Sequence, residues 1–150
     1  MNPTEQKIDL LSLAPEELEQ FLAQLGEPRY RAGQLFSAMH RGVPLEAITN
    51  ISKATKEKIS AAGFYRFPTI KRKLVSAIDG TVKYLFALRD GELIESVVMK
   101  YKHGNTICVS SQAGCRMGCR FCASTLRGLT RNLNPSEILG QVMAAQADLG

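Results

Sequence analysis

One stretch of the sequence decides the fold: residues 105–141, NTICVSSQAGCRMGCRFCASTLRGLTRNLNPSEILGQ. It opens with an apolar strand signal at 106–110, continues through a long loop rich in Gly, Cys and Arg, and closes with a helix start. Asn134 suits the N-cap, Pro135 suits the first helical position, and Glu137 completes a capping box. Strand, loop and helix in this order form half of a βαβ unit. We therefore expect the first unit of a parallel α/β arrangement, in a chain that is part of a longer protein.

The loop contains three cysteines with the spacing C-x3-C-x2-C: Cys115, Cys119 and Cys122. Gly114 and Gly118 allow the backbone to curl tightly, so that three thiolates can turn toward one point. Thiolates are soft ligands that suit zinc or an iron–sulfur cluster. Structural zinc usually has four protein ligands in two pairs, and a second pair is missing here. The pattern therefore favours a four-iron cluster with one open iron, while zinc with Cys108 or His103 as the fourth ligand stays an alternative.

Before this stretch, the hydrophobic pattern has a period of two from Thr69 onward. It predicts strands near 69–78, 82–89 and 92–100. Asp-Gly pairs at 79–80 and 90–91 separate these runs, and Asp-Gly is a strong hairpin signal. We therefore expect an antiparallel β meander.

The first part of the chain has helical spacing instead. The first predicted helix starts at Pro15 and stops at Gly26, and the second runs from Pro28 to Gly42. A third uses Ser52 as its N-cap and ends at Gly63. Three short helices with tight turns predict a small bundle.

The predicted fold class is thus α+β in its N-terminal part, a small helical bundle plus an antiparallel meander. The first βα unit of a partial (β/α) barrel of the TIM type follows. The predicted domains are a helical domain over 1–66, a β-strand extension over 67–104 and the start of the barrel over 105–150. The loop after the first barrel strand would lie at the C-terminal face, where barrel chemistry is found.

Composition excludes several classes of protein. The chain has 150 residues, 45% of them hydrophobic and 22% charged, which is typical of a packed domain rather than a disordered segment. No apolar run is long enough to span a bilayer, and acids rather than a basic segment lie near the N-terminus, so we expect a cytoplasmic protein. The formal net charge is +5, and no Asp or Glu lies between Glu95 and Glu137. A cationic stretch of this kind favours a polyanionic partner, although a solvated basic loop is the simpler alternative.

Several segments together resemble the radical S-adenosylmethionine (SAM) RNA adenosine methyltransferases of the RlmN/Cfr type. In the cysteine region they are ICVSSQAGC at 107–115, FCAST at 121–125, RNL at 131–133 and EILGQV at 137–142. Upstream they are LSL at 11–13, PRYRA at 28–32 followed by Gln34, and DGTVK at 79–83. The likeness covers nearly the whole chain, which resembles the N-terminal portion of such an enzyme. A small departure is Ala113, where Val or Ser is common in the family.

The resemblance implies a [4Fe–4S] cluster and SAM as cofactors. Cys115, Cys119 and Cys122 match the cluster ligands, and Phe121 matches the aromatic residue of the cofactor-binding signature. In such enzymes the open iron chelates SAM, and one electron yields a 5′-deoxyadenosyl radical. A small reducing protein such as flavodoxin or ferredoxin would supply that electron.

The resemblance also implies two catalytic residues. The family methylates a cysteine near its own C-terminus, and that methyl carbon then adds to an adenine ring carbon. Cys108 matches the second cysteine, which resolves the protein–RNA adduct through a transient disulfide. Glu95 matches a proton-accepting carboxylate, and we expect it to be partly buried, with a raised pKa. On sequence alone, the simpler alternatives are a small buried strand cysteine and an outward strand-edge acid.

The implied partners are 23S rRNA and tRNA, methylated at adenosine C2 by a monomeric enzyme. Six cations of the helical domain are candidates for phosphate contacts: Arg29, Arg31, Arg41, Lys53, Lys56 and Lys58. One alternative is the C8-methylating, resistance-type relative on the same scaffold. An alternative of another class is a noncatalytic zinc-binding RNA module. Because the methyl-carrying cysteine has no counterpart here, we expect this chain alone to be inactive.

Overall fold

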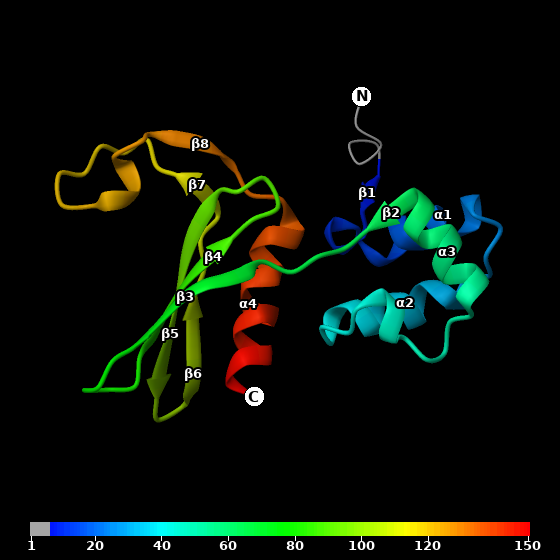
Figure 1. The fold of residues 1–150 in the computed structure, drawn as a ribbon, viewed down its shortest axis with the longest axis horizontal. Coiled ribbons are helices and arrows are strands. Elements are labelled where there is room, and N and C mark those ends of the chain that lie inside the picture. Colours follow the sequence, from blue (N-terminus) through cyan, green and yellow to red (C-terminus); the bar gives the residue numbers. More distant parts are fainter. Residues whose placement is uncertain (1–6) are drawn as a thin grey trace. The chain divides into compact units, whose positions relative to one another are not determined.

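The computed structural model describes residues 7–150, so residues 1–6 of the predicted 1–66 domain lie outside the described part (Figure 1). The chain divides into two compact units between Arg66 and Phe67. We call the described residues up to Arg66 the helical unit and residues 67–150 the sheet unit.

The helical unit contains three α-helices, two short 3-10 helices and a pair of two-residue strands. In chain order these are β1 Ile8–Asp9, η1 Leu10–Ser12, α1 Pro15–Gln24, α2 Tyr30–His40, η2 Leu45–Ala47, α3 Lys53–Ala62 and β2 Gly63–Phe64. The Ser52 side chain accepts a hydrogen bond from the Thr55 N–H, as expected of an N-cap. Fully buried residues such as Leu18, Leu35 and Ile59 come from all three helices and form the core. The prediction of three short helices is confirmed.

The sheet unit contains six strands, one 3-10 helix and one long helix. In chain order these are β3 Thr69–Val75, β4 Val82–Ala87, β5 Leu93–Tyr101, β6 Gly104–Cys108, β7 Gln112–Gly114, η3 Ala123–Thr125, β8 Leu129–Asn132 and α4 Pro135–Leu149. The predicted meander corresponds to β3, β4 and β5, and α4 begins at the predicted Pro135. Its N-terminus has the expected cap, since the Glu137 carboxylate accepts a hydrogen bond from the Asn134 N–H at 2.8 Å.

The main sheet has the order β3-β4-β5-β6, and each neighbouring pair is antiparallel. Alternation along the strands buries one face, which includes Tyr84, Phe86 and Ile94. That face packs against α4 through residues such as Ala145, and Figure 1 shows the helix running along the sheet. The other face, which we call the open face, carries no helix within the sheet unit.

Two features differ from the expectations for the sheet unit. The predicted 106–110 strand is observed two residues earlier, as β6, and it pairs antiparallel with β5 in the meander sheet. The predicted loop rich in Gly, Cys and Arg contains the small antiparallel pair β7–β8. The mixed α/β content matches the predicted fold class, while the domain border at residue 104 stays a prediction. No helix within residues 7–150 is both long and apolar enough to cross a bilayer.

Candidate functional site

The three spaced cysteines lie on residues 115–128, which we call the cysteine loop. Its base is closed by the Cys115 N–H, which donates to the Gly128 carbonyl at 3.0 Å. Gly114 has a φ of 75°, a left-handed conformation that favours glycine. An added Cβ at Gly114 would collide with that same Gly128 carbonyl oxygen. The sequence therefore needs a glycine where the loop leaves β7.

All four cysteines of the chain are free, so the structure does not support the expected disulfide bond. Cys119 is exposed, and Cys115 and Cys122 are half-buried. Among residues 7–150, no three Cys, His, Asp or Glu side chains are arranged to hold a metal ion. Within residues 115–128 the backbone makes local turns, such as the one closed by the Cys122 N–H, which donates to the Cys119 carbonyl at 3.2 Å.

The chemistry of the donor set nevertheless fits a cluster. Three unpaired thiols lie on one loop, and Gly118 at φ 69° gives the backbone the freedom to curl between them. The aromatic Phe121 is 94% exposed, and Met117 and Leu126 of the same loop are also exposed. The loop thus presents soft ligands and apolar side chains to its surroundings rather than to the core.

The two predicted catalytic residues share the open face of the main sheet. Cys108 is exposed at the end of β6 and lies opposite Val97 of β5, and Glu95 is two residues further along β5. The Glu95 side chain is 51% exposed, and its carboxylate pairs with the Lys83 ammonium at 3.0 Å. The expected partial burial of Glu95 is therefore wrong, because the alternation of β5 buries Ile94 and Ser96 and turns Glu95 outward.

A buried glutamine that the sequence analysis did not single out holds the chain between β6 and β7. Gln141 of α4 is completely buried, and its carbonyl oxygen accepts from the Ser96 hydroxyl at 2.6 Å and the Ser110 N–H at 2.8 Å. Its amide donates to the carbonyls of Ser110 at 2.8 Å and Glu137 at 2.9 Å. The Ser110 hydroxyl donates in turn to the Glu95 carbonyl at 2.6 Å. Gln141 thus fixes the segment that joins Cys108 to the cysteine loop. A polar side chain between Ile138 and Ala145 on the apolar side of α4 is the sequence signal that could have identified it.

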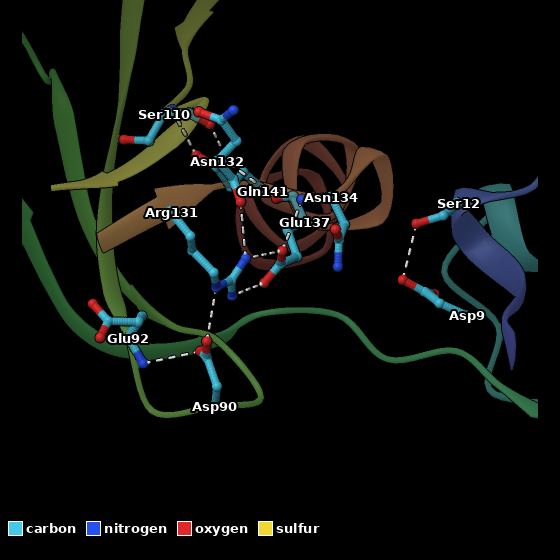
Figure 2. A network of polar contacts seen from close by, with 10 residues as sticks. All are labelled: Asp9, Ser12, Asp90, Glu92, Ser110, Arg131, Asn132, Asn134, Glu137 and Gln141. Carbon is cyan, nitrogen blue, oxygen red and sulfur yellow. Dashed lines mark hydrogen bonds and ion pairs between the residues drawn. The ribbon is translucent and has the colours of Figure 1, made fainter. Parts of the chain in front are cut away.

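On the C-terminal side of the cysteine loop, Arg131 links β8 to α4 and to the turn between β4 and β5 (Figure 2). Its two terminal nitrogens donate to the two Glu137 oxygens, each at 2.7 Å, and its Nε donates to an Asp90 oxygen at 2.8 Å. The hydrogen bond from Arg131 lowers the pKa of Asp90. Burial raises the pKa of Glu137, but the hydrogen bonds from Arg131 and from the Asn134 N–H lower it by more. The pKa of Glu137 therefore lies below its usual range. Arg131 lies in the acid-free stretch between Glu95 and Glu137 that favours a polyanionic partner, but its guanidinium is held by protein carboxylates.

Most of the cations expected to contact RNA in the helical unit also bind protein groups. Arg29 pairs with Glu19 at 2.7 Å, while Arg31 donates to the Asn50 carbonyl at 2.7 Å. Arg41, Lys56 and Lys58 bind the Ser37 carbonyl, the Glu46 carbonyl and the Glu27 carboxylate, respectively. The two histidines stack on aromatic neighbours, His40 on Phe36 and His103 on Tyr101.

Comparison with known proteins places these features in a family. A family model described as the ribosomal RNA large subunit methyltransferase N-terminal domain matches residues 8–63. A protein of Alkaliphilus oremlandii named "probable dual-specificity RNA methyltransferase RlmN" is 47% identical over 146 residues, covering 97% of this chain and 43% of that protein. A protein of the same name from Alkaliphilus metalliredigens is 49% identical over 145 residues, covering 96% of this chain and 41% of that protein.

The crystal structure of a radical SAM methyltransferase from Sphaerobacter thermophilus superposes with a TM-score of 0.85 at 39% identity. The match covers 95% of this chain and 42% of that one. The chain corresponds to the N-terminal portion of an RlmN-type protein. The family resemblance drawn from segments along nearly the whole chain is thereby confirmed. This RlmN-type chain spans about two fifths of the length of the relatives it matches.

Proposed function

We propose that the chain is part of a radical SAM methyltransferase that methylates adenosine C2 in 23S rRNA and in tRNA through a methyl-cysteine intermediate. The observation that carries the proposal is the free C-x3-C-x2-C thiol set on one loop of a chain whose relatives are named RNA methyltransferases. The helical unit would bind RNA. The sheet unit would begin the barrel, with β6 and α4 as its first βα unit. The edge of β6 that has no strand partner within residues 7–150 would accept a further strand.

In this proposal, the thiols of Cys115, Cys119 and Cys122 would hold a [4Fe–4S] cluster, and Phe121 would contribute to cofactor binding. When bound, the cluster and SAM supply the one-electron chemistry that the protein's own side chains lack. An external reducing protein provides the electron. The exposed, cationic cysteine loop carries Arg116, Arg120 and Arg127 and no acid, which suits an acidic donor.

Glu95 and Cys108 have the roles of proton acceptor and resolving thiol in the proposal. They lie on neighbouring strands and face the same side of the sheet, so one substrate base can reach both. Lys83 holds the Glu95 carboxylate at the open face by their ion pair. A substrate that displaces Lys83 would free this carboxylate to accept a proton.

Anaerobic reconstitution of the chain with ferrous iron and sulfide tests the proposal. We expect a brown protein with close to four irons per chain, and loss of both colour and iron in Cys119→Ala. Cys108→Ala is the matched control, since Cys108 is outside the ligand set and the variant should keep its iron. A colourless protein that binds one zinc instead would contradict the proposal and support a zinc-binding RNA module.

A further inference from the structure

Two stems connect the cysteine loop to the rest of the sheet unit. The leading stem, residues 109–114, comes from β6, and the returning stem, residues 129–134, goes to α4. The stems are joined to each other by the β7–β8 pairing and by the Leu133 N–H, which donates to the Ser111 carbonyl at 2.9 Å. The stems are also held to the main sheet, by the Ser110 hydroxyl bond to the Glu95 carbonyl and by Ala113 and Leu133, which are buried in the core of the sheet unit.

Helix α4 adds polar contacts to both stems from two side chains one turn apart. Glu137 and Gln141 are four residues apart and so lie on one face of the helix. Gln141 binds the Ser110 backbone of the leading stem, and Glu137 binds Arg131 of the returning stem. Arg131 extends the contact to Asp90 in the turn between β4 and β5.

The chemistry of both contacts favours one geometry. The Gln141 carboxamide makes all four hydrogen bonds of which it is capable, and its pair with Ser110 copies the backbone pairing of a neighbouring strand. The Arg131–Glu137 contact is bidentate, which sets the direction of the side chains as well as their distance. An apolar residue at 141 would serve helix packing equally well, so the buried carboxamide has a role in placing the stem.

We propose that Gln141 and the Arg131–Glu137 pair are positioning residues that fix both stems of the cysteine loop. The proposal rests on the proposed function, because what the fixed stems position is the thiol set of Cys115, Cys119 and Cys122. Closing three thiols around one cluster requires the loop to rearrange, and fixed stems leave fewer arrangements to search. Residues that orient metal ligands in this way commonly change metal affinity by about 10–100-fold when they are substituted.

We call Gln141 and the Arg131–Glu137 pair the clamp. Amide hydrogen exchange at Cys115 tests the clamp without any metal. Gln141→Met and Arg131→Met keep side-chain bulk but remove the polar contacts, and we expect each to raise the Cys115 exchange rate about tenfold or more. Tyr84→Phe is the matched control, because it removes the 2.7 Å hydrogen bond to Asp148 near the far end of α4. It should leave Cys115 exchange unchanged. If Gln141→Met does not fold, Ser96→Ala removes only one of its four hydrogen bonds and should give a smaller rise.

The rate at which a chelator removes iron from the reconstituted chain gives the second readout. We expect Gln141→Met and Arg131→Met to lose iron about tenfold faster or more, with a changed electron paramagnetic resonance spectrum after reduction, and Tyr84→Phe to match the parent chain. If Gln141→Met and Arg131→Met show the same Cys115 exchange rate or the same rate of iron loss as the parent chain, the proposed clamp is overturned. A parent chain that binds no iron while the exchange rates respond as expected would instead overturn the proposed function.

Discussion

At the scale of single residues, Arg131 makes the stability of the sheet unit depend on pH. Its hydrogen bonds help to hold the pKa of Glu137 below 4.5 and that of Asp90 below 3.8, so the folded state favours both charged forms. The stability that these carboxylates contribute is therefore complete above about pH 4.5 and is lost as the pH falls through the lowered folded values. The guanidinium side chain is 30% exposed, which limits the size of the effect.

We expect Arg131→Met to lower the free energy of unfolding at pH 7 by about 1–2 kcal/mol, a range reduced for solvent screening. The difference from the parent chain should narrow as the pH falls below about 4, because the carboxylates become neutral in both proteins. Urea unfolding followed by circular dichroism at several pH values measures this. Arg29→Met removes the exposed pair with Glu19 in the helical unit and should have little effect at any pH. A difference for Arg131→Met that stays constant down to about pH 2 would contradict the assignment.

At the scale of elements, Gly140 sets how closely α4 approaches the chain before β3. A Cβ at Gly140 would lie 2.6 Å from the ring carbon Cδ of Pro68, and a proline ring has little freedom to move away. We expect Gly140→Ala to destabilise the protein by about 1–3 kcal/mol through overpacking, despite the better helix propensity of alanine. Gly33 in α2 is the matched control, since nothing lies within 4 Å of its Cβ position. Gly33→Ala should stabilise the protein by about 0.5–1 kcal/mol. Thermal unfolding measures both variants, and a gain in stability for Gly140→Ala as well would refute the close contact with Pro68.

Substitutions at Gly114 and Gly118 test the contact at the base of the cysteine loop. Gly114→Ala adds a Cβ against the Gly128 backbone carbonyl and also strains a left-handed residue, so the Cys115–Gly128 hydrogen bond should break. Gly118 has a similar φ but open space around it, so Gly118→Ala should cost only the conformational strain, about 1–2 kcal/mol. Limited proteolysis should cut the cysteine loop much faster in Gly114→Ala than in Gly118→Ala. Equal cleavage rates would show that the base contact does not hold the loop.

Elements with local signals were predictable from the sequence, and those that depend on distant partners were not. Helix α4 carries its start in Asn134, Pro135 and Glu137: the helix begins at Pro135, and the Glu137 carboxylate accepts from the Asn134 N–H as expected. Strands β7 and β8 have three and four residues without clear alternation, and their pairing joins positions about twenty residues apart, such as Gln112 and Asn132. The same limit applies to the candidate site. The motif located the thiols, but the contacts of Gln141 and Arg131 depend on how α4 packs.

At the scale of the whole molecule, the open face of the main sheet is apolar over much of its area. Leu74, Leu93 and Tyr101 are each about half exposed, and strand register places them on the same side as Glu95 and Cys108. The edge of β6 away from β5 has no strand partner within residues 7–150. The relatives are more than twice as long as the matched region, so those proteins have further chain that could cover the corresponding face.

The number of cysteines predicts that the 150-residue chain has no methyltransferase activity on its own. The proposed chemistry needs three cluster thiols, a resolving thiol and a methyl-carrying thiol, whereas the chain has four cysteines. If the first two roles use Cys115, Cys119, Cys122 and Cys108, none is left to carry the methyl group. We therefore expect the chain, even with iron and sulfide restored, to transfer no tritiated methyl from SAM to unmodified 23S rRNA. The full-length Alkaliphilus oremlandii relative is the positive control in the same assay. Methyl transfer by the chain alone would show that one of the four thiols has a different role, and Cys108→Ala would then be the first variant to measure.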